Sequence, residues 1–287
     1  MMDYTEGTEV YDGNRVGILL VHGLGGSPLE LKYLAQSLNK AGYTVVCPLM
    51  AGHGGTPAEF EHSRWTEWYV SAELALERMK RDCDVIITGG ISAGAVVALR
   101  LAANRKELVQ GCMLYAPTFW PNGWAIPRAF NLFKLVTQKW FANLFMFSEK
   151  APYGIKDERL RKLVLDNLTA DGKPLADIFN RKGGTLLELM WLARDTKARL
   201  GDITQPVLAV HPREDDQSDM ANTLLLQRKL AGRVEVMVLD DSYHMVVLDR
   251  QRQLVVERSL TYLANLTAEL EAASERQRIR TPQGRAR

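Results

Sequence analysis

The sequence predicts an α/β fold in which helices cover both faces of a mainly parallel sheet of about six strands. The first observation behind this prediction is a series of short apolar runs, rich in Val and Ile, that do not alternate with polar residues. The second is that stretches with helical patterning lie between most of these runs. Strand alternating with helix is typical of a parallel sheet, because each parallel strand needs a crossover to reach the next.

Six apolar runs have the length expected of buried strands. They are residues 16–21, 43–47, 85–88, 112–115, 207–210 and 234–239. The predicted helices are residues 29–41, 66–81, 95–104, 219–230 and 251–271. The fifteen residues before the first run are few, so we expect only a short N-terminal addition to this sheet.

The alternation stops between Pro117 and Thr204, where helical patterns continue for about 85 residues without a convincing strand. We interpret residues 118–200 as a helical cap inserted into a core made of residues 1–117 and 201–287. The N-terminal and C-terminal parts of the chain are therefore expected to share one sheet.

Aromatic residues are frequent in the first half of the predicted cap. Part of the set repeats at helical spacing, which favours packing of the cap onto the core. Some of the rings are also candidates for an apolar substrate pocket over the carboxyl edge of the sheet, where open α/β sheets bind ligands. For this pocket we select Trp120, Trp124 and Phe130.

The composition indicates a globular protein, with 46% hydrophobic and 24% charged residues and a formal net charge of +2. Five arginines lie between Arg276 and Arg287, so the folded part is close to neutral. This balance argues against nucleic acid as a partner. Ser, Gln, Pro and Gly separate the charges, and residues from about 274 to 287 are therefore expected to form a basic, disordered tail.

The three cysteines, Cys47, Cys83 and Cys112, match no disulfide or metal-binding spacing. Each lies in or next to a predicted strand, so we interpret them as reduced core residues. The N-terminus is acidic and lacks the features of a secretion signal, and no window of about 18 residues is free of charge. A cytoplasmic location without stable membrane insertion is the expectation; the oligomeric state stays open.

The segment Gly90-Ile-Ser-Ala-Gly94 fits the pattern GxSxG between a predicted strand and an alanine-rich helix. In this motif the serine occupies a strained strand-to-helix turn that exposes its hydroxyl, and small neighbours prevent collisions with adjacent elements. Ordinary turns also use Gly and Ser, but the position after a buried strand favours Ser92 as a nucleophile.

A serine nucleophile needs a histidine base, and the chain has five histidines. His244 is the best candidate, because it follows the last predicted strand and its loop should emerge on the same sheet edge as Ser92. The other four lie after earlier strands, in segments with other expected roles.

The acid that orients this histidine should come from the loop after the fifth predicted strand. This loop offers Glu214, Asp215, Asp216 and Asp219. We choose Asp215, with Asp216 as the alternative, and expect the remaining carboxylates to be solvated loop charges.

The oxyanion of an acyl-transfer reaction needs two hydrogen-bond donors. The glycine loop His22-Gly-Leu-Gly-Gly26 can direct the backbone N–H of Leu24 toward the sheet edge, and Ala93 can supply the second N–H from the start of its helix. A phosphate-binding turn is the alternative interpretation of this loop, but it lacks the Lys and the glycine spacing of nucleotide motifs.

With these motifs in place, the chain resembles the α/β-hydrolase fold family, and within it bacterial carboxylesterases related to monoacylglycerol lipases. The resemblance covers residues 17 to about 263 and includes VHGLGG, GHGG, GISAGA, PREDD and SYHMV. It implies a catalytic triad of Ser92, Asp215 and His244 and a helical cap. The chain departs from the group at Ala93, where a larger residue is common, and at Ala95, where Gly is frequent.

The predicted activity is hydrolysis of a small-molecule carboxylic ester with a short-to-medium acyl chain through an acyl-enzyme, without cofactor or metal. A monoacylglycerol lipase, a lysophospholipase or a thioesterase is the alternative within enzymes. A ligand-binding protein that retains the fold without turnover is the alternative from another class, because fold does not fix function.

Overall fold

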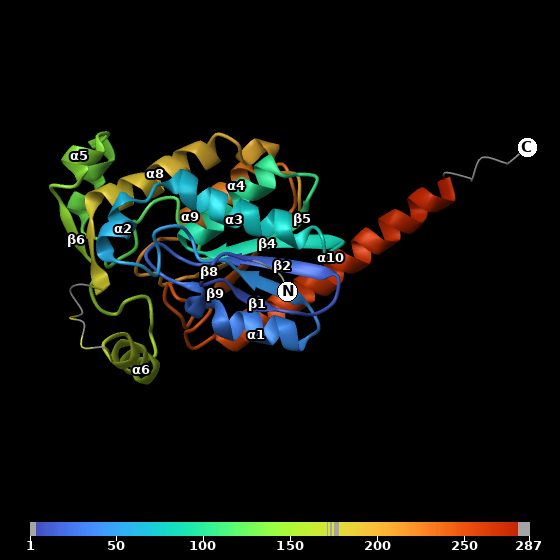
Figure 1. Cartoon of the computed structure of the whole chain (residues 1–287), viewed down its shortest axis with the longest axis horizontal. Helices are drawn as coiled ribbons and strands as arrows, with labels where there is room; N and C mark the ends of the chain where they lie inside the picture. The colour runs from blue at the N-terminus through green and yellow to red at the C-terminus, as the bar shows by residue number, and fades with distance from the viewer. Residues whose placement is uncertain (1–3, 171, 173, 175–177, 281–287) are drawn as a thin grey trace, which may run out of the picture.

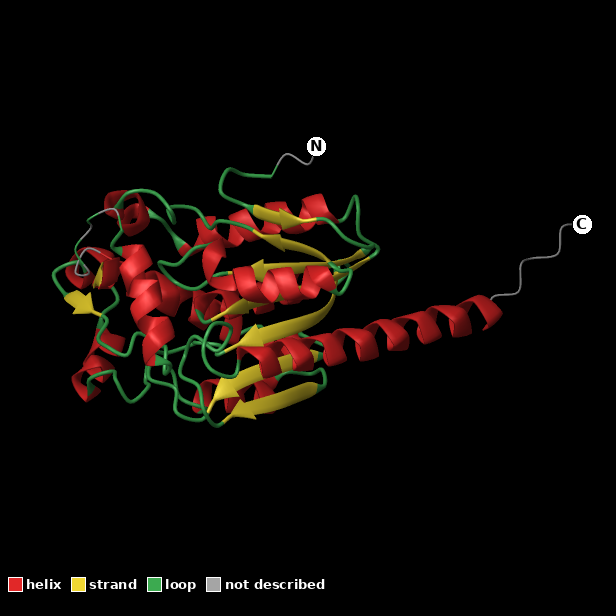
Figure 2. Ribbon diagram, turned by 90° about the horizontal axis from the view of Figure 1, so that it is seen from below, coloured by secondary structure: helices red, strands yellow, loops and turns green. Residues whose placement is uncertain are grey.

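The computed structural model describes residues 4–170, 172, 174 and 178–280. A sheet of seven strands has the order β1-β3-β2-β4-β5-β8-β9 (Figures 1 and 2). Its strands are β1 (Glu9–Tyr11), β2 (Val16–Val21), β3 (Thr44–Cys47), β4 (Val85–Ile91), β5 (Val109–Tyr115), β8 (Val207–Pro212) and β9 (Val234–Leu239). Six are parallel, as predicted, and β1 pairs antiparallel with β3 at one edge.

Helices cover both faces of this sheet (Figure 1). On one face lie α1 (Lys32–Lys40), which continues a short 3-10 turn η1 (Pro28–Leu31), and α10 (Arg252–Arg280). On the other lie α3 (Trp65–Met79), α4 (Ala93–Asn104), α8 (Gly183–Lys197) and α9 (Ala221–Lys229). Each face has its own apolar core, so the central strands are buried on both sides. This explains why the apolar runs do not alternate.

Three strands of the sheet are longer than the sequence predicted, and one of them, β8, continues two residues beyond 210 to Pro212. Strand β4 continues beyond Thr88 through two glycines, and β5 begins at Val109, three residues before Cys112. Glycine has a low strand propensity, so the pattern ended early at Gly89. Pairing of Gly89 and Gly90 with both neighbouring strands maintains the extended conformation there.

The segment between β5 and β8 is mainly helical. It contains η2 (Arg128–Leu135), α5 (Lys139–Ala142), α6 (Glu158–Leu168), α8 and η3 (Leu200–Asp202). It also contains β6 (Met146–Ser148) and β7 (Asn180–Lys182), which form a separate antiparallel pair. The expectation of no strand in this segment was therefore wrong. Strands of three residues are too short to show an alternating pattern.

The C-terminal helix is longer than predicted. Residues 274–280 continue α10, whereas their composition predicted part of a disordered tail. Ala, Glu, Gln and Arg are good helix formers, and this propensity extends the helix beyond its last packed turn. Residues 281–287 of the predicted tail lie outside the described residues.

The three cysteines are free and buried, as predicted. Within the described part of the chain, no helix has the length and apolar character needed to span a membrane. The parallel strands end at a common edge, on the side of the segment between β5 and β8 (Figure 2). The loops after β2, β4, β5, β8 and β9 leave the sheet at this edge, which is where α/β sheets place their functional residues.

Candidate active site

Ser92 occupies the corner between β4 and α4. Its backbone has φ 55° and ψ −117°, a conformation that is uncommon for a residue with a side chain. A Cβ at Gly90 or Gly94 would collide with the carbonyl oxygen of Val21 on the neighbouring strand. The predicted strain and the need for small neighbours are therefore both present in the structure.

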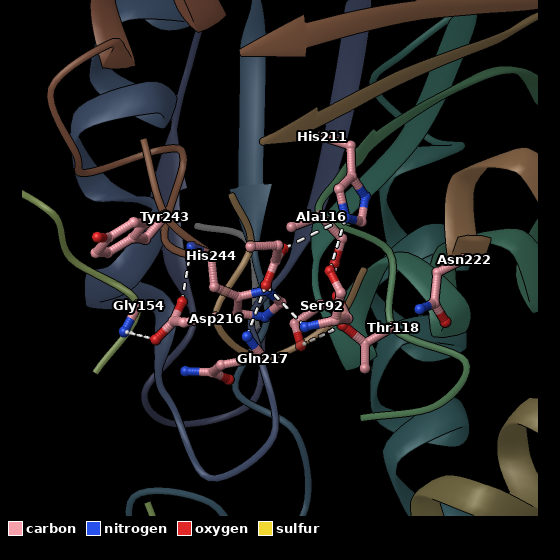
Figure 3. A network of polar contacts seen from close by, with 12 residues as sticks. Ser92, Ala116, Thr118, Gly154, His211, Asp216, Gln217, Asn222, Tyr243 and His244 are labelled. Atoms are coloured by element: carbon pink, nitrogen blue, oxygen red, sulfur yellow. Dashed lines mark hydrogen bonds and ion pairs between the residues drawn. The ribbon is translucent and has the colours of Figure 1, made fainter. Parts of the chain in front are cut away.

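The hydroxyl of Ser92 donates a hydrogen bond to Thr118 Oγ1 at 3.2 Å. Thr118 follows β5 and lies 2.9 Å from Ser218 Oγ, so a chain of hydroxyls joins Ser92 to the loop after β8 (Figure 3). The sequence reasoning missed Thr118, although its position directly after a strand at the carboxyl edge was an available signal.

His244 and Asp215 form a buried pair. The Nδ1 atom of His244 lies 3.0 Å and 2.9 Å from the two carboxylate oxygens of Asp215. Asp215 also accepts hydrogen bonds from the backbone N–H groups of Gln217 at 2.8 Å and Ser218 at 2.7 Å. These contacts fix the carboxylate and favour the tautomer with a proton on Nδ1.

The second ring nitrogen of His244, Nε2, is buried and has no hydrogen-bond partner among the described residues. Figure 3 shows the imidazole directed toward Ser92. With its proton on Nδ1, the ring presents an unshared electron pair at Nε2. The nitrogen is therefore available to accept a proton.

The charges around His244 favour its protonated form. Burial alone would lower the pKa of the imidazole, but the charge and hydrogen bond of Asp215 outweigh it, with further contributions from Asp216 and Glu149. The net effect is a pKa above the ordinary value of histidine. Such a ring is stabilised when it takes up a proton during a reaction.

The other carboxylates of the loop after β8 have different roles. Asp216 accepts the backbone N–H of His244 at 3.2 Å and that of Gly154 at 2.9 Å, so it joins the histidine loop to the segment between β5 and β8. Glu214 pairs with Lys156 at 2.7 Å, and Asp219 accepts from the N–H of Ala221 at the start of α9. Of the four carboxylates, Asp215 is the one that contacts the imidazole.

The glycine loop after β2 lies beside Ser92. A Cβ at Gly23 would be 3.7 Å from the Cβ of Ser92. Leu24 is half-buried and packs against the core, and among the described residues no acceptor is bonded to its N–H. Ala93 is the first residue of α4, where backbone N–H groups have no partner within the helix.

His22 stabilises this loop through hydrogen bonds of its ring. Its Nδ1 donates to the carbonyl of Gly23 at 2.9 Å, and its Nε2 accepts from the N–H of Met50 at 3.1 Å. Burial lowers the pKa of His22 to about 4, so the ring is neutral. The N–H of Gly23 donates to the carboxyl of Glu30 at 3.0 Å, a contact that the sequence reasoning did not anticipate.

His211 lies behind the acid. Its Nε2 is 2.8 Å from the carbonyl of Ser218 and 3.4 Å from Asp215, and its Nδ1 contacts the hydroxyl of Thr223 at 2.9 Å. Burial lowers the pKa of His211, which outweighs the opposing effect of Asp215. Both ring nitrogens of His211 have hydrogen-bond partners, so the ring holds the loop after β8 in place.

The three aromatic residues predicted for the pocket do not form one group. Phe130 is buried in a cluster within the segment between β5 and β8, and Trp120 packs on it with ring centroids 5.1 Å apart. Trp124 is 57% exposed and contacts Tyr243 and the carbonyl of Glu214. A cavity of about 320 Å³ includes Trp124 and Phe130 in its lining, but its lining residues all lie between 121 and 131.

In the described part of the chain, no three His, Cys, Asp or Glu side chains are grouped as metal ligands. The polar groups at the sheet edge are instead arranged as a hydroxyl, an imidazole and a carboxylate, each on a different post-strand loop. This arrangement is able to transfer a proton from the hydroxyl and to stabilise the resulting charge.

Known proteins resemble this chain over most of its length. A thermostable monoacylglycerol lipase of Bacillus sp. (strain H-257) is 27% identical over 87% of this chain and 90% of its own length. A carboxylesterase of Bacillus subtilis (strain 168) is 24% identical over 89% of this chain and 95% of its own length. These matches confirm the resemblance that the motifs indicated.

A solved structure described under LipS and LipT, two metagenome-derived lipolytic enzymes, superimposes with a TM-score of 0.72. It is 25% identical to this chain and covers 92% of it and 100% of its own length. This match confirms the α/β-hydrolase fold. The family model described as serine aminopeptidase, S33, matches residues 13–251, and the chain therefore belongs to this family of α/β hydrolases.

Proposed function

We propose that the protein is a carboxylic ester hydrolase in which Ser92, His244 and Asp215 form a catalytic triad. The observation that carries this proposal is the contact of Asp215 with Nδ1 of His244, which leaves Nε2 unbonded within the described residues and directed toward Ser92 (Figure 3). The strained corner at Ser92 supports the same assignment.

In the proposed mechanism, the hydroxyl hydrogen of Ser92 turns from Thr118 to Nε2 of His244. Ser92 Oγ then attacks the ester carbonyl while the imidazole takes the proton, and Asp215 stabilises the imidazolium. The N–H groups of Leu24 and Ala93 bind the oxyanion. Collapse of this intermediate transfers the proton to the leaving alcohol and forms the acyl-enzyme. Water, deprotonated by His244, then releases the acid.

The substrates we propose are esters with short-to-medium acyl chains. The carboxylesterase relative supports carboxylic esters as the substrate class, and the acyl length is part of the proposal. The family description, serine aminopeptidase, makes amides a further class for comparison, and thioesters are another because one triad serves all three leaving groups.

A monoacylglycerol lipase is the second candidate, and a specific observation favours it. The segment between β5 and β8 exposes large apolar side chains, among them Trp140 at 70% and Leu144 at 71% exposure. Exposed apolar groups of this kind are suited to contact a lipid surface. Preference for medium-chain monoglycerides over p-nitrophenyl esters of the same acyl length would favour the lipase.

The decisive test compares the wild type with Ser92→Ala. The wild type should react rapidly with a fluorophosphonate and hydrolyse p-nitrophenyl butyrate, whereas the variant should do neither while retaining its circular dichroism spectrum. Labelling of the wild type without turnover of esters, thioesters or amides would favour the ligand-binding alternative. Normal turnover by the variant would reject the triad.

A further inference from the structure

Arg181 lies against the glycine loop that borders the candidate active site. It is the middle residue of β7, and a Cβ at Gly25 would collide with its guanidinium group. The guanidinium carbon lies 5.6 Å from the centroid of the Phe60 ring. Gly25 directly follows Leu24, so the guanidinium of Arg181 lies beside the loop that we propose to bind the oxyanion.

Arg181 differs from two other cationic side chains of the segment between β5 and β8. Lys182 pairs with Glu61 at 2.7 Å and Lys139 pairs with Glu188 at 2.8 Å. Among the described residues, no carboxylate lies within ion-pair distance of Arg181 and no side-chain hydrogen bond involves it. A half-buried guanidinium with this environment keeps its five N–H donors for another partner.

Two carboxyl groups face Arg181 at longer range, and burial favours the neutral form of each. Burial raises the pKa of Glu30 to about 7, although Arg181 and the N–H of Gly23 lower it. Burial also raises the pKa of Glu149, again against the effect of Arg181. His244, Asp216 and Gln217 are the other polar groups near Glu149. The permanent charge of Arg181 is therefore only partly neutralised.

We propose that Arg181 binds an anionic group of the substrate, a carboxylate or a phosphate, beside the oxyanion loop. This inference rests on the proposed ester hydrolysis and specifies its substrate as an ester that carries a second, ionised group. The planar fork of a guanidinium matches carboxylate and phosphate oxygens with two parallel hydrogen bonds, which a point charge does not provide.

The location of Arg181 supports a substrate contact over a purely structural role. A structural arginine that joins the inserted segment to the glycine loop would be expected to bond a carbonyl or a carboxylate there, as Lys139 does with the carbonyl of Ser63 at 3.1 Å. Arg181 makes no such bond within the described residues. The anion can belong to the acyl part or to the alcohol part of the ester, and the test separates these sources.

The test measures kcat/KM for matched esters in a pH-stat. Monomethyl glutarate and methyl pentanoate differ by a carboxylate in the acyl part. Butyryloxyacetate and ethyl butyrate differ by a carboxylate in the alcohol part, and butyryl glycerol phosphate and monobutyrin differ by a phosphate there. We expect at least one anionic ester to be preferred over its neutral partner by the wild type.

Arg181→Met should reduce that anionic-to-neutral ratio about 10- to 100-fold, the effect of losing a charged hydrogen bond, and mainly through KM. Arg181→Lys should restore part of the ratio. Lys182→Met is the matched control from the same strand and should leave the ratio unchanged. An unchanged ratio in Arg181→Met, or a wild-type preference for butyrylcholine over all anionic esters, overturns the inference.

The ester hydrolase proposal is tested separately, by measuring whether the wild type hydrolyses the neutral esters of these pairs. Binding of monomethyl glutarate to Ser92→Ala, measured by calorimetry, is independent of turnover. If the double variant Ser92→Ala/Arg181→Met no longer binds monomethyl glutarate, the anion site is supported even if the protein does not hydrolyse esters. Equal binding to both variants overturns it.

Discussion

Functional side chains are positioned in different ways in two regions of the molecule. One region is the set of loops that follow the strands of the main sheet, and the other is the segment between β5 and β8. Ser92, Asp215 and His244 each follow a parallel strand, so the sheet brings residues that are far apart in sequence to one edge. Arg181 reaches the same edge from a strand of three residues outside the main sheet. The loops that follow long apolar strands can be recognised from a sequence pattern, whereas the position of a three-residue strand depends on tertiary packing that leaves no such pattern.

The largest expected effect lies in the core loops. His244→Ala should reduce kcat/KM for p-nitrophenyl butyrate by at least about 10⁴-fold, because the base is lost, while Asp216→Asn should cost far less. Steady-state kinetics on both variants measures this difference. A larger loss in Asp216→Asn than in His244→Ala would mean that the carboxylate bound to the backbone is the more important group.

The next largest expected effect is on the free energy of unfolding, which should depend on whether a helix packs against the core. Leu192 of α8 is fully buried against the core, and Leu192→Ala should lower the free energy of unfolding by about 2–5 kcal/mol. Leu163 of α6 is 58% exposed, and Leu163→Ala should change it by less than about 0.5 kcal/mol. Urea denaturation monitored by fluorescence provides both values. Equal effects would show that α8 does not anchor its segment to the core.

The tight corner at Ser92 should tolerate no added methyl group. Gly94→Ala places a Cβ against the carbonyl oxygens of Val21 and His22, which are fixed by the sheet. We expect a loss of about 1–3 kcal/mol in stability, and a lower kcat because the glycine loop must shift. Ala95→Gly, one position along the same helix, is the control for kcat, because it removes a methyl group from the helix and adds none at the corner. Wild-type kcat in Gly94→Ala would contradict the required close approach.

The smallest expected effect is on the pH profile. Only the neutral imidazole accepts a proton, so kcat/KM should fall as pH decreases through the pKa of His244, which the surrounding carboxylates raise above its ordinary value. Asp216→Asn removes one of these charges and should move the acid limb to lower pH. Ser63→Ala is the control and should leave the acid limb where it is in the wild type. If the limb also stays in place in Asp216→Asn, a group other than His244 titrates.

The sequence was sufficient for the fold class and for the parallel sheet, because strands that are buried on both faces appear as short apolar runs in the sequence. Asp215 was chosen over Asp216 without a pattern that separates them, and the resemblance indicated the same residue. Both carboxylates are buried and adjacent, and only the loop geometry distinguishes their roles. Thr118, Glu30 and Arg181 were missed because their importance depends on contacts across the fold. The pocket residues remain a prediction.

The outer part of α10 extends away from the body, on the side opposite the carboxyl edge of the sheet (Figure 2). A support or a fused domain attached there would leave substrate access free. This geometry recommends α10 as the attachment point for immobilising the protein on a surface, with its reactive face turned toward the solution.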